Sequence, residues 1–156
     1  MLTGMQVFYQ CRTGDHVEKK STLIALIAAV IITAVVICCI FADSGDPAIS
    51  IDRDILRIDC TFGTEINISE IREIKLDERS FDEIAPAWKK TNGFDGFNGS
   101  LKGNFQTDDL GKILVYVQKD SKPTIVIKRG GKEEVYISFS KPEETKKIYE
   151  AFIAFA

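Results

Sequence analysis

The chain has 156 residues, of which 45% are hydrophobic and 28% charged, and its formal net charge is −3 at pH 7. This length suits one domain with a substantial core rather than several domains. From residue 43 onward 17 lysines and arginines are interspersed with 21 aspartates and glutamates. Such a balance disfavours nucleic acid as a partner, because a nucleic-acid surface requires clustered basic residues.

The N-terminal part is predicted to contain a membrane anchor. Residues 1–20 have mixed charges and no periodic apolar pattern, which is typical of a short tail. Residues 23–42 are apolar throughout except for Thr33 and carry no ionisable group besides two thiols. Twenty helical residues span roughly the 30 Å core of a bilayer, so we predict a transmembrane helix over residues 21–42. A cleaved signal peptide is disfavoured, since its apolar region has only about 7–15 residues.

The charges beside this run predict its orientation. Arg12, Lys19 and Lys20 precede it, and Arg53 is the only positive residue close behind it. Positive residues are retained on the cytoplasmic side of a membrane. We therefore expect a cytoplasmic N-terminus and an extracytoplasmic C-terminal domain, although this small bias leaves the inverse orientation open.

Small residues recur along one face of the predicted anchor. They are Ser21, Ala25, Ala29 and Thr33, spaced four residues apart. Small side chains allow close helix–helix contact in lipid, so this face is a candidate for transmembrane packing and allows a homodimer.

Residues 43–48 are predicted to be a juxtamembrane linker, and residues 49–156 a single mainly β domain. Alternating apolar and polar residues indicate half-buried strands around positions 56–60, 65–68 and 74–77. Three further β-rich runs, at residues 113–118, 124–129 and 132–139, are separated by turn-forming residues that include Gly130 and Gly131. We predict that these last three runs form an antiparallel meander.

A helix is predicted after the last strand, because the apolar period changes there from 2 to 3.6. Ser140 is a candidate N-cap with Glu143 as its capping-box partner, and Pro142 is tolerated in the first turn. One apolar stripe would cover the open end of the sheet; it contains Ile148, Tyr149, Phe152 and Ile153. The expected fold is an antiparallel β-barrel or sandwich of about seven strands with a C-terminal capping α-helix.

Several segments resemble the bacterial pleckstrin-homology (PH) domain families that occur behind membrane anchors. The resemblance rests on residues 91–97, Gly103-Asn104-Phe105, the strand at residues 113–117, and the Lys-Pro-Glu-Glu-Thr sequence at residues 141–145, followed by Ile148-Tyr149. It covers the chain from residue 49 to the C-terminus. The resemblance implies a PH-like fold and an interaction or scaffold module, and it supplies no active-site residues.

The residues that commonly carry catalysis are scarce in the domain. The single histidine, His16, lies in the N-terminal tail, and Cys60 is the domain's only cysteine. These facts exclude a histidine-dependent triad, an intradomain disulfide and a cysteine zinc site. Two carboxylate pairs remain, Asp52 with Asp54 and Asp108 with Asp109, and they are typical of solvated turns. We expect no catalytic residue, no metal and no cofactor.

The best candidate for a binding surface is the glycine-rich segment at residues 92–100. Phe94 and Phe97 are apolar residues in a stretch too polar for a core strand, and Asn92 and Asp95 accompany them. We interpret this segment as a loop that binds a partner or touches the bilayer interface. The alternative is that one or both phenylalanines fold back and close the end of the barrel.

The preferred functional hypothesis is a single-pass membrane protein that displays a PH-like interaction or scaffold domain without catalytic chemistry. Its partner would be another protein or a cell-envelope component. The inverse orientation would instead give a cytoplasm-facing regulatory or immunity-type protein. A third hypothesis, a carboxylate-dependent enzyme, requires Asp52, Asp54, Asp108 or Asp109 to meet in one pocket.

Overall fold

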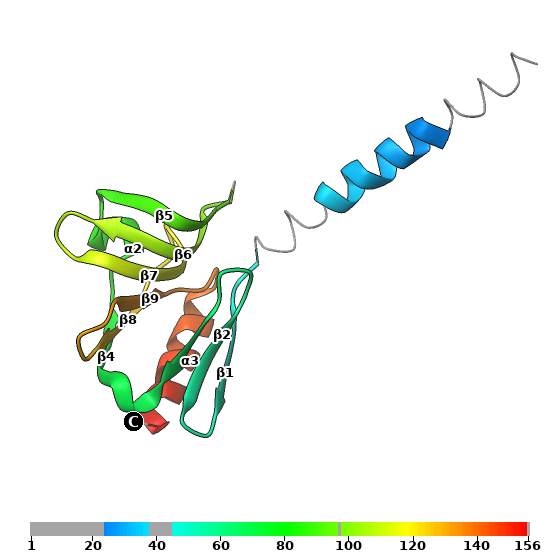
Figure 1. Cartoon of the computed structure of the whole chain (residues 1–156). Coiled ribbons are helices and arrows are strands. Elements are labelled where there is room, and N and C mark those ends of the chain that lie inside the picture. Colours follow the sequence, from blue (N-terminus) through cyan, green and yellow to red (C-terminus); the bar gives the residue numbers. More distant parts are fainter. Residues whose placement is uncertain (1–23, 38–44, 97, 156) are drawn as a thin grey trace, which may run out of the picture. The chain divides into compact units, whose positions relative to one another are not determined.

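The computed structural model describes residues 24–37, 45–96 and 98–155. The chain divides into two compact units, Met1–Phe41 and Ala42–Ala156. In the first unit residues 24–37 form an α-helix, drawn in blue in Figure 1.

The N-terminal helix carries large apolar side chains on its surface, with exposed fractions from 49% for Ile37 to 68% for Val30. The Thr33 hydroxyl donates a 2.8 Å hydrogen bond to the carbonyl of Ala29, one turn earlier. Within residues 24–37 and the other described parts, no helix is both long and apolar enough to cross a membrane. Of the span predicted over residues 21–42, the structure describes residues 24–37, which are helical; residues 21–23, Ser21 among them, and residues 38–42 lie outside the described residues.

The second unit is mainly β, and its described residues form nine strands and a long C-terminal helix. In chain order the elements are β1 (Ala48–Asp52), β2 (Ile55–Asp59), β3 (Thr64–Asn67), the 3-10 helix η1 (Ile68–Glu70), β4 (Ile71–Asp77), α2 (Phe81–Ile84), β5 (Trp88–Asp95), β6 (Ser100–Thr107), β7 (Gly111–Gln118), β8 (Thr124–Arg129), β9 (Glu134–Ile137) and α3 (Pro142–Phe155). The prediction of about seven strands was therefore too low.

The strands form two sheets. A three-stranded antiparallel sheet has the order β1-β2-β3, and a six-stranded sheet has the order β4-β8-β9-β7-β6-β5. The predicted meander of β7, β8 and β9 was wrong, because β9 lies between the other two and runs parallel to β7. β7 is apolar and buried on both faces of the sheet. β9 is buried on both faces as well, through Val135, Tyr136 and Ile137, as is usual for parallel strands.

The six-stranded sheet separates two apolar clusters. One lies between this sheet, the three-stranded sheet and α3, and its largest members include Tyr116, Ile127 and Phe152. The other lies on the opposite face under α2 and includes Phe81, Phe105 and Tyr136. Consecutive residues of β7 alternate between the clusters, as the period of a strand requires. Tyr116 and Tyr136 consequently lie on opposite faces of the sheet, although their strands are neighbours.

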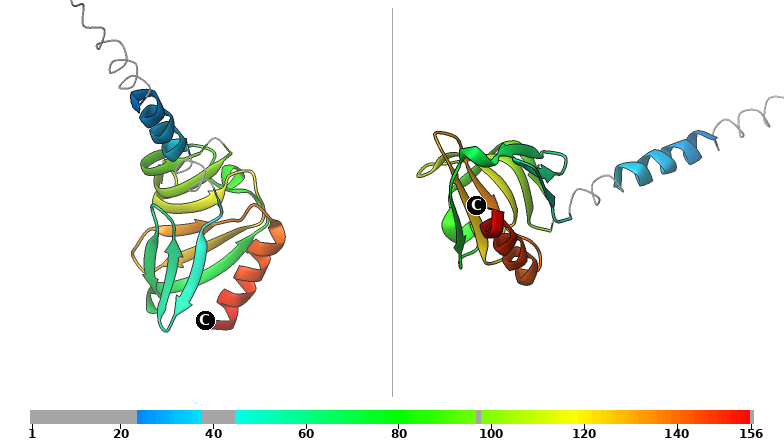
Figure 2. Two further views of the ribbon diagram at one scale, coloured as in Figure 1. Left: turned by 90° about the vertical axis from the view of Figure 1, so that its right-hand side faces the viewer. Right: turned by 90° about the horizontal axis from the view of Figure 1, so that it is seen from below.

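Helix α3 covers the open side between the two sheets, as Figures 1 and 2 show. It begins at Pro142, so Ser140 is not its N-cap residue. The Ser140 hydroxyl and amide instead donate hydrogen bonds of 2.6 and 2.9 Å to the carboxylate of Asp46. These bonds tie the segment before β1 to the segment before α3.

Candidate functional site

The structure places the sequence-predicted binding residues mainly on a strand. Asn92, Phe94 and Asp95 belong to β5, so the proposed loop at residues 92–100 is reduced to the turn between β5 and β6. Asn92 and Asp95 are exposed, and Phe94 is half-buried. A Cβ at Gly96 would lie 2.5 Å from the Phe94 ring, so this ring folds over the turn. Phe97 lies outside the described residues, and a binding role for these four positions stays a prediction.

The two carboxylate pairs occupy turns of different sheets. Asp52 and Asp54 flank Arg53 in the β1–β2 turn, and Asp108 and Asp109 lie between β6 and β7. All four are exposed. In the described ranges no group of three or more histidine, cysteine, aspartate or glutamate residues is arranged to hold a metal ion.

The basic residues near the β8–β9 turn lie beside acidic partners. Lys128 Nζ lies 2.9 Å from Glu73, and Lys132 Nζ lies 2.6 Å from Glu70. Arg129 lies 3.3 Å from the Glu133 carboxylate and also donates to the Glu133 carbonyl. The three cations are therefore largely compensated and do not form an anion-binding face.

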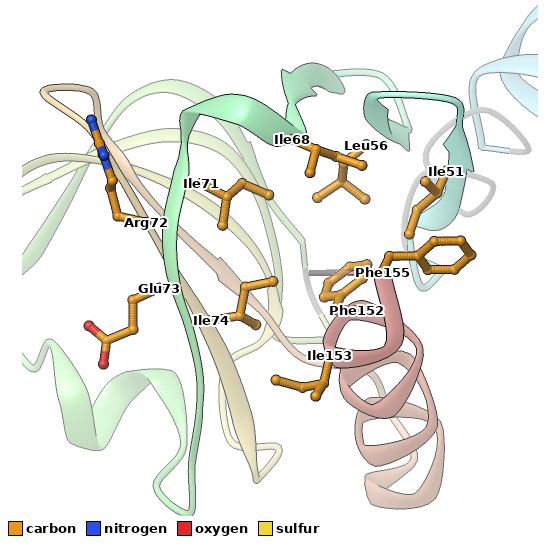
Figure 3. Close-up of a pocket in the computed structure, with 10 residues that line it drawn as sticks. All are labelled: Ile51, Leu56, Ile68, Ile71, Arg72, Glu73, Ile74, Phe152, Ile153 and Phe155. Atoms are coloured by element: carbon orange, nitrogen blue, oxygen red, sulfur yellow. The ribbon is translucent and has the colours of Figure 1, made fainter.

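An apolar groove is the most distinctive surface feature of the described domain. It has a volume of about 230 Å³ and lies between β4, the C-terminal end of α3 and the β1–β2 hairpin (Figure 3). We call it the β4–α3 groove; its lining residues are Ile51, Leu56, Ile68, Ile71, Arg72, Glu73, Ile74, Phe152, Ile153 and Phe155. Its volume is below the roughly 300–1,000 Å³ of a typical small-molecule site and suits one or two apolar side chains.

The groove contains most of the exposed large apolar surface of the described domain. Ile153 is 50% exposed and Phe155 is 64% exposed, and both lie on the last turn of α3. Leu110, in the β6–β7 turn, is the other large hydrophobic residue of residues 45–155 that is exposed to this degree, at 40%. Contiguous exposed apolar surface of this kind indicates an interaction site more often than a scattered residue does.

A free sheet edge runs along one side of the groove. β4 is the last strand of the six-stranded sheet, paired with β8 on one side only. Among the described residues, no main-chain hydrogen bond other than those of the β4–β8 ladder reaches residues 73–77. An exposed edge of this kind offers N–H and C=O groups to another extended chain.

A β-bulge determines on which side of β4 the side chains at this edge lie. The register with β8 shifts between Ile71 and Glu73, so Arg72 is an extra residue. Ile71 and Ile74 point toward α3, whereas Arg72 and Glu73 point to the opposite side of the strand (Figure 3). The edge therefore has an apolar side that faces α3 across the groove and a charged side whose side chains point away from α3.

The charged side of β4 carries more uncompensated positive than negative charge. Glu73 is paired with Lys128, which lowers the Glu73 pKa chiefly by a hydrogen bond. Asp77 accepts hydrogen bonds from the Arg79 side chain, and these lower its pKa to about 2. Lys75 reaches only the Asp77 carboxylate, at 3.9 Å. Arg72 makes no hydrogen bond or ion pair with any described residue.

The chain matches the bacterial PH domain family over residues 48–152. It belongs to this family. The match covers more than half of the chain, and the two sheets with a C-terminal helix fit a PH-like sandwich. No curated protein and no solved structure shows significant similarity to the chain.

Family membership favours a non-catalytic interaction or scaffold module. It confirms the PH-like resemblance seen in the sequence. The β4–α3 groove, in contrast, was not recognised from the sequence. The available signal was that the apolar stripe of α3 continues past Ile153, since Phe155 lies seven residues after Ile148 and therefore on the same face of the helix.

Proposed function

We propose that this chain is a membrane-anchored interaction protein whose PH-like domain binds a protein partner through the β4–α3 groove. The observation that carries the proposal is the combination of an apolar groove with an unpaired sheet edge, both formed within the domain. A groove of this kind binds an extended segment by burying its apolar side chains while its main chain pairs with the edge.

The membrane part of the proposal is supported by the sequence. The apolar run at residues 23–42 is long enough for a bilayer, and Lys19 and Lys20 precede it. The described helix at residues 24–37 exposes isoleucine, leucine and valine side chains, which is the surface that lipid would cover. We propose a cytoplasmic N-terminus and an extracytoplasmic domain, with an envelope protein as the partner.

Two side chains make the proposal testable in cells. Ile153 lines the groove and is 50% exposed, whereas Leu110 is a comparable exposed apolar residue in the β6–β7 turn, which does not line the groove. A photo-cross-linking amino acid is introduced at one position or the other in the full chain. We expect a discrete cross-linked species from position 153 in the membrane fraction and none from position 110.

Equal cross-linking from both positions, or none from position 153, would show that the groove is not the binding surface. Recovery of the full chain in the soluble fraction would contradict the membrane part of the proposal.

A further inference from the structure

We infer that the partner of the β4–α3 groove is an extended segment in which apolar and acidic side chains alternate, and that it adds to the free edge of β4. The inference rests on the proposed function and deepens it by naming the chemistry of the bound segment. Its basis is that one side of the edge strand β4 is apolar and the other side is charged.

The apolar half of the pattern follows from the geometry of β4. A strand that pairs with β4 has alternate side chains on the two faces of the sheet. Those on the Ile71 and Ile74 side enter the groove, where Ile153 and Phe155 leave apolar surface exposed. The groove volume of about 230 Å³ admits one or two such side chains and is too small for a helix.

The acidic side chains of the bound segment are inferred from the charges on the other side of β4. The two carboxylates of β4, Glu73 and Asp77, are already paired with Lys128 and Arg79. Arg72 has no partner among the described residues, and Lys75 lies at the outer limit of an ion pair with Asp77. An added strand would place its outward side chains opposite these two cations, and opposite charges across a strand pair are favourable.

Charge complementarity also favours an acidic segment over a second copy of the chain as the occupant of the β4–α3 groove. Two β4 edges brought together would bring Arg72 and Lys75 of each copy to one interface, while their carboxylates stayed paired internally. An acidic segment has no such repulsion. A hydrophobic strand without charges would fill the groove and leave Arg72 unpaired.

The test uses the full chain in detergent micelles and a fluorescein-labelled synthetic peptide of alternating valine and glutamate. A peptide of alternating valine and lysine tests the sign of the charge. A peptide with the same valines and glutamates in two separate blocks tests the alternation. We expect binding of the alternating glutamate peptide to be stronger than that of either control by about tenfold.

Two variants of groove residues and one control variant locate the peptide. Ile153→Asp places a charge in the groove and should weaken binding about tenfold, while Leu110→Asp, a matched change on an exposed residue outside the groove, should leave it unchanged. Arg72→Gln should weaken binding of the glutamate peptide by about threefold to fivefold and leave the blocked peptide unaffected. Both changed residues of the groove are substantially exposed, so folding should be preserved.

Strand addition has its own signature in amide hydrogen exchange. Bound peptide should slow exchange at alternate amides of residues 73–77, because only the amides that face the free edge gain partners. Uniform or absent protection would contradict strand addition. Equal binding of the lysine peptide, no loss with Ile153→Asp, or chain dimers that exclude the peptide would each overturn the inference.

The two proposals fail in different ways. A discrete cross-link from position 153 in cells, combined with no binding of the glutamate peptide, would retain the proposed function and reject the alternating acidic segment. Absence of both would reject the groove as a binding surface.

Discussion

Two adjacent residues of α3 have opposite roles. Both line the groove, but Phe152 is 4% exposed and belongs to the cluster between the sheets, whereas Ile153 is 50% exposed. We expect Phe152→Ala to lower the free energy of unfolding by about 3–4 kcal/mol, because it leaves a cavity in the core. Ile153→Ala should change it by less than about 1 kcal/mol. Thermal unfolding followed by the fluorescence of Trp88, the only tryptophan, would measure both.

Equal destabilisation by the two substitutions would mean that Ile153 is part of the core. The groove would then be a packing defect rather than an accessible surface.

Asp77 is a carboxylate whose charge is coupled to folding. Its side chain is 11% exposed and accepts two hydrogen bonds from the Arg79 guanidinium, at 2.9 and 2.8 Å. Because these bonds lower its pKa to about 2, their stabilisation is complete above the unfolded pKa near 4 and is lost as the pH falls toward 2. We expect Asp77→Asn to cost about 1–2 kcal/mol at pH 7.

The pH dependence provides the check. The difference in unfolding free energy between the wild type and Asp77→Asn should decrease steadily between about pH 4 and pH 2. A difference that is constant over this interval would show that the carboxylate charge does not contribute to stability.

At the scale of elements, the pairing of β5 with β6 depends on a close approach of two backbones. Gly103 has a φ of +113°, and a Cβ there would lie 2.6 Å from the Asn92 carbonyl oxygen and 2.8 Å from the Gly93 Cα. We expect Gly103→Ala to destabilise the domain by about 3 kcal/mol or more, from backbone strain and from the clash. Gly111 also has a positive φ, +71°, but nothing lies within 4 Å of its added Cβ.

Gly111→Ala is therefore the matched control and should cost only about 1 kcal/mol, from backbone strain alone. Chemical denaturation of both variants would measure the difference. Similar losses for the two alanines would indicate that the β5 and β6 backbones are not in close contact.

The sequence predicted several strands that have a clear alternation or a long apolar run, and it missed β5, which has neither. Leu56 and Ile58 marked β2, and the apolar runs marked β7 and β8. Residues 92–95 of β5 were taken for part of a loop, because β5 has four consecutive exposed residues on an edge strand, Lys89-Lys90-Thr91-Asn92. Burial of one face supplies the alternating signal, and these four residues have no buried face.

Strand order was harder to predict than strand position. The turn at residues 130–133 joins β8 to β9 as expected, yet local signals do not state which strand lies beside β7. The groove was hard to predict from the sequence for the same reason. Its residues come from β1, β2, η1, β4 and α3, and their proximity results from the packing of α3 between the two sheets.

At the scale of the whole molecule, the account predicts an extracytoplasmic domain. Asp109 is exposed in the β6–β7 turn and is therefore a suitable labelling site. With the native cysteines replaced by serine, Asp109→Cys should react with a membrane-impermeant maleimide on intact cells. Reaction only after lysis would place the domain in the cytoplasm and favour a regulatory or immunity-type role.

The most direct test of the central claim is the size of the complex that the full chain forms in cells. Membranes are solubilised in a mild detergent, and the wild type, Leu110→Asp and Ile153→Asp chains are compared by native gel electrophoresis. We predict that the wild type and Leu110→Asp migrate in the same larger complex, and that Ile153→Asp migrates as the smaller free chain while its thermal unfolding is unchanged. Identical migration of all three chains would contradict the claim that the β4–α3 groove binds a partner.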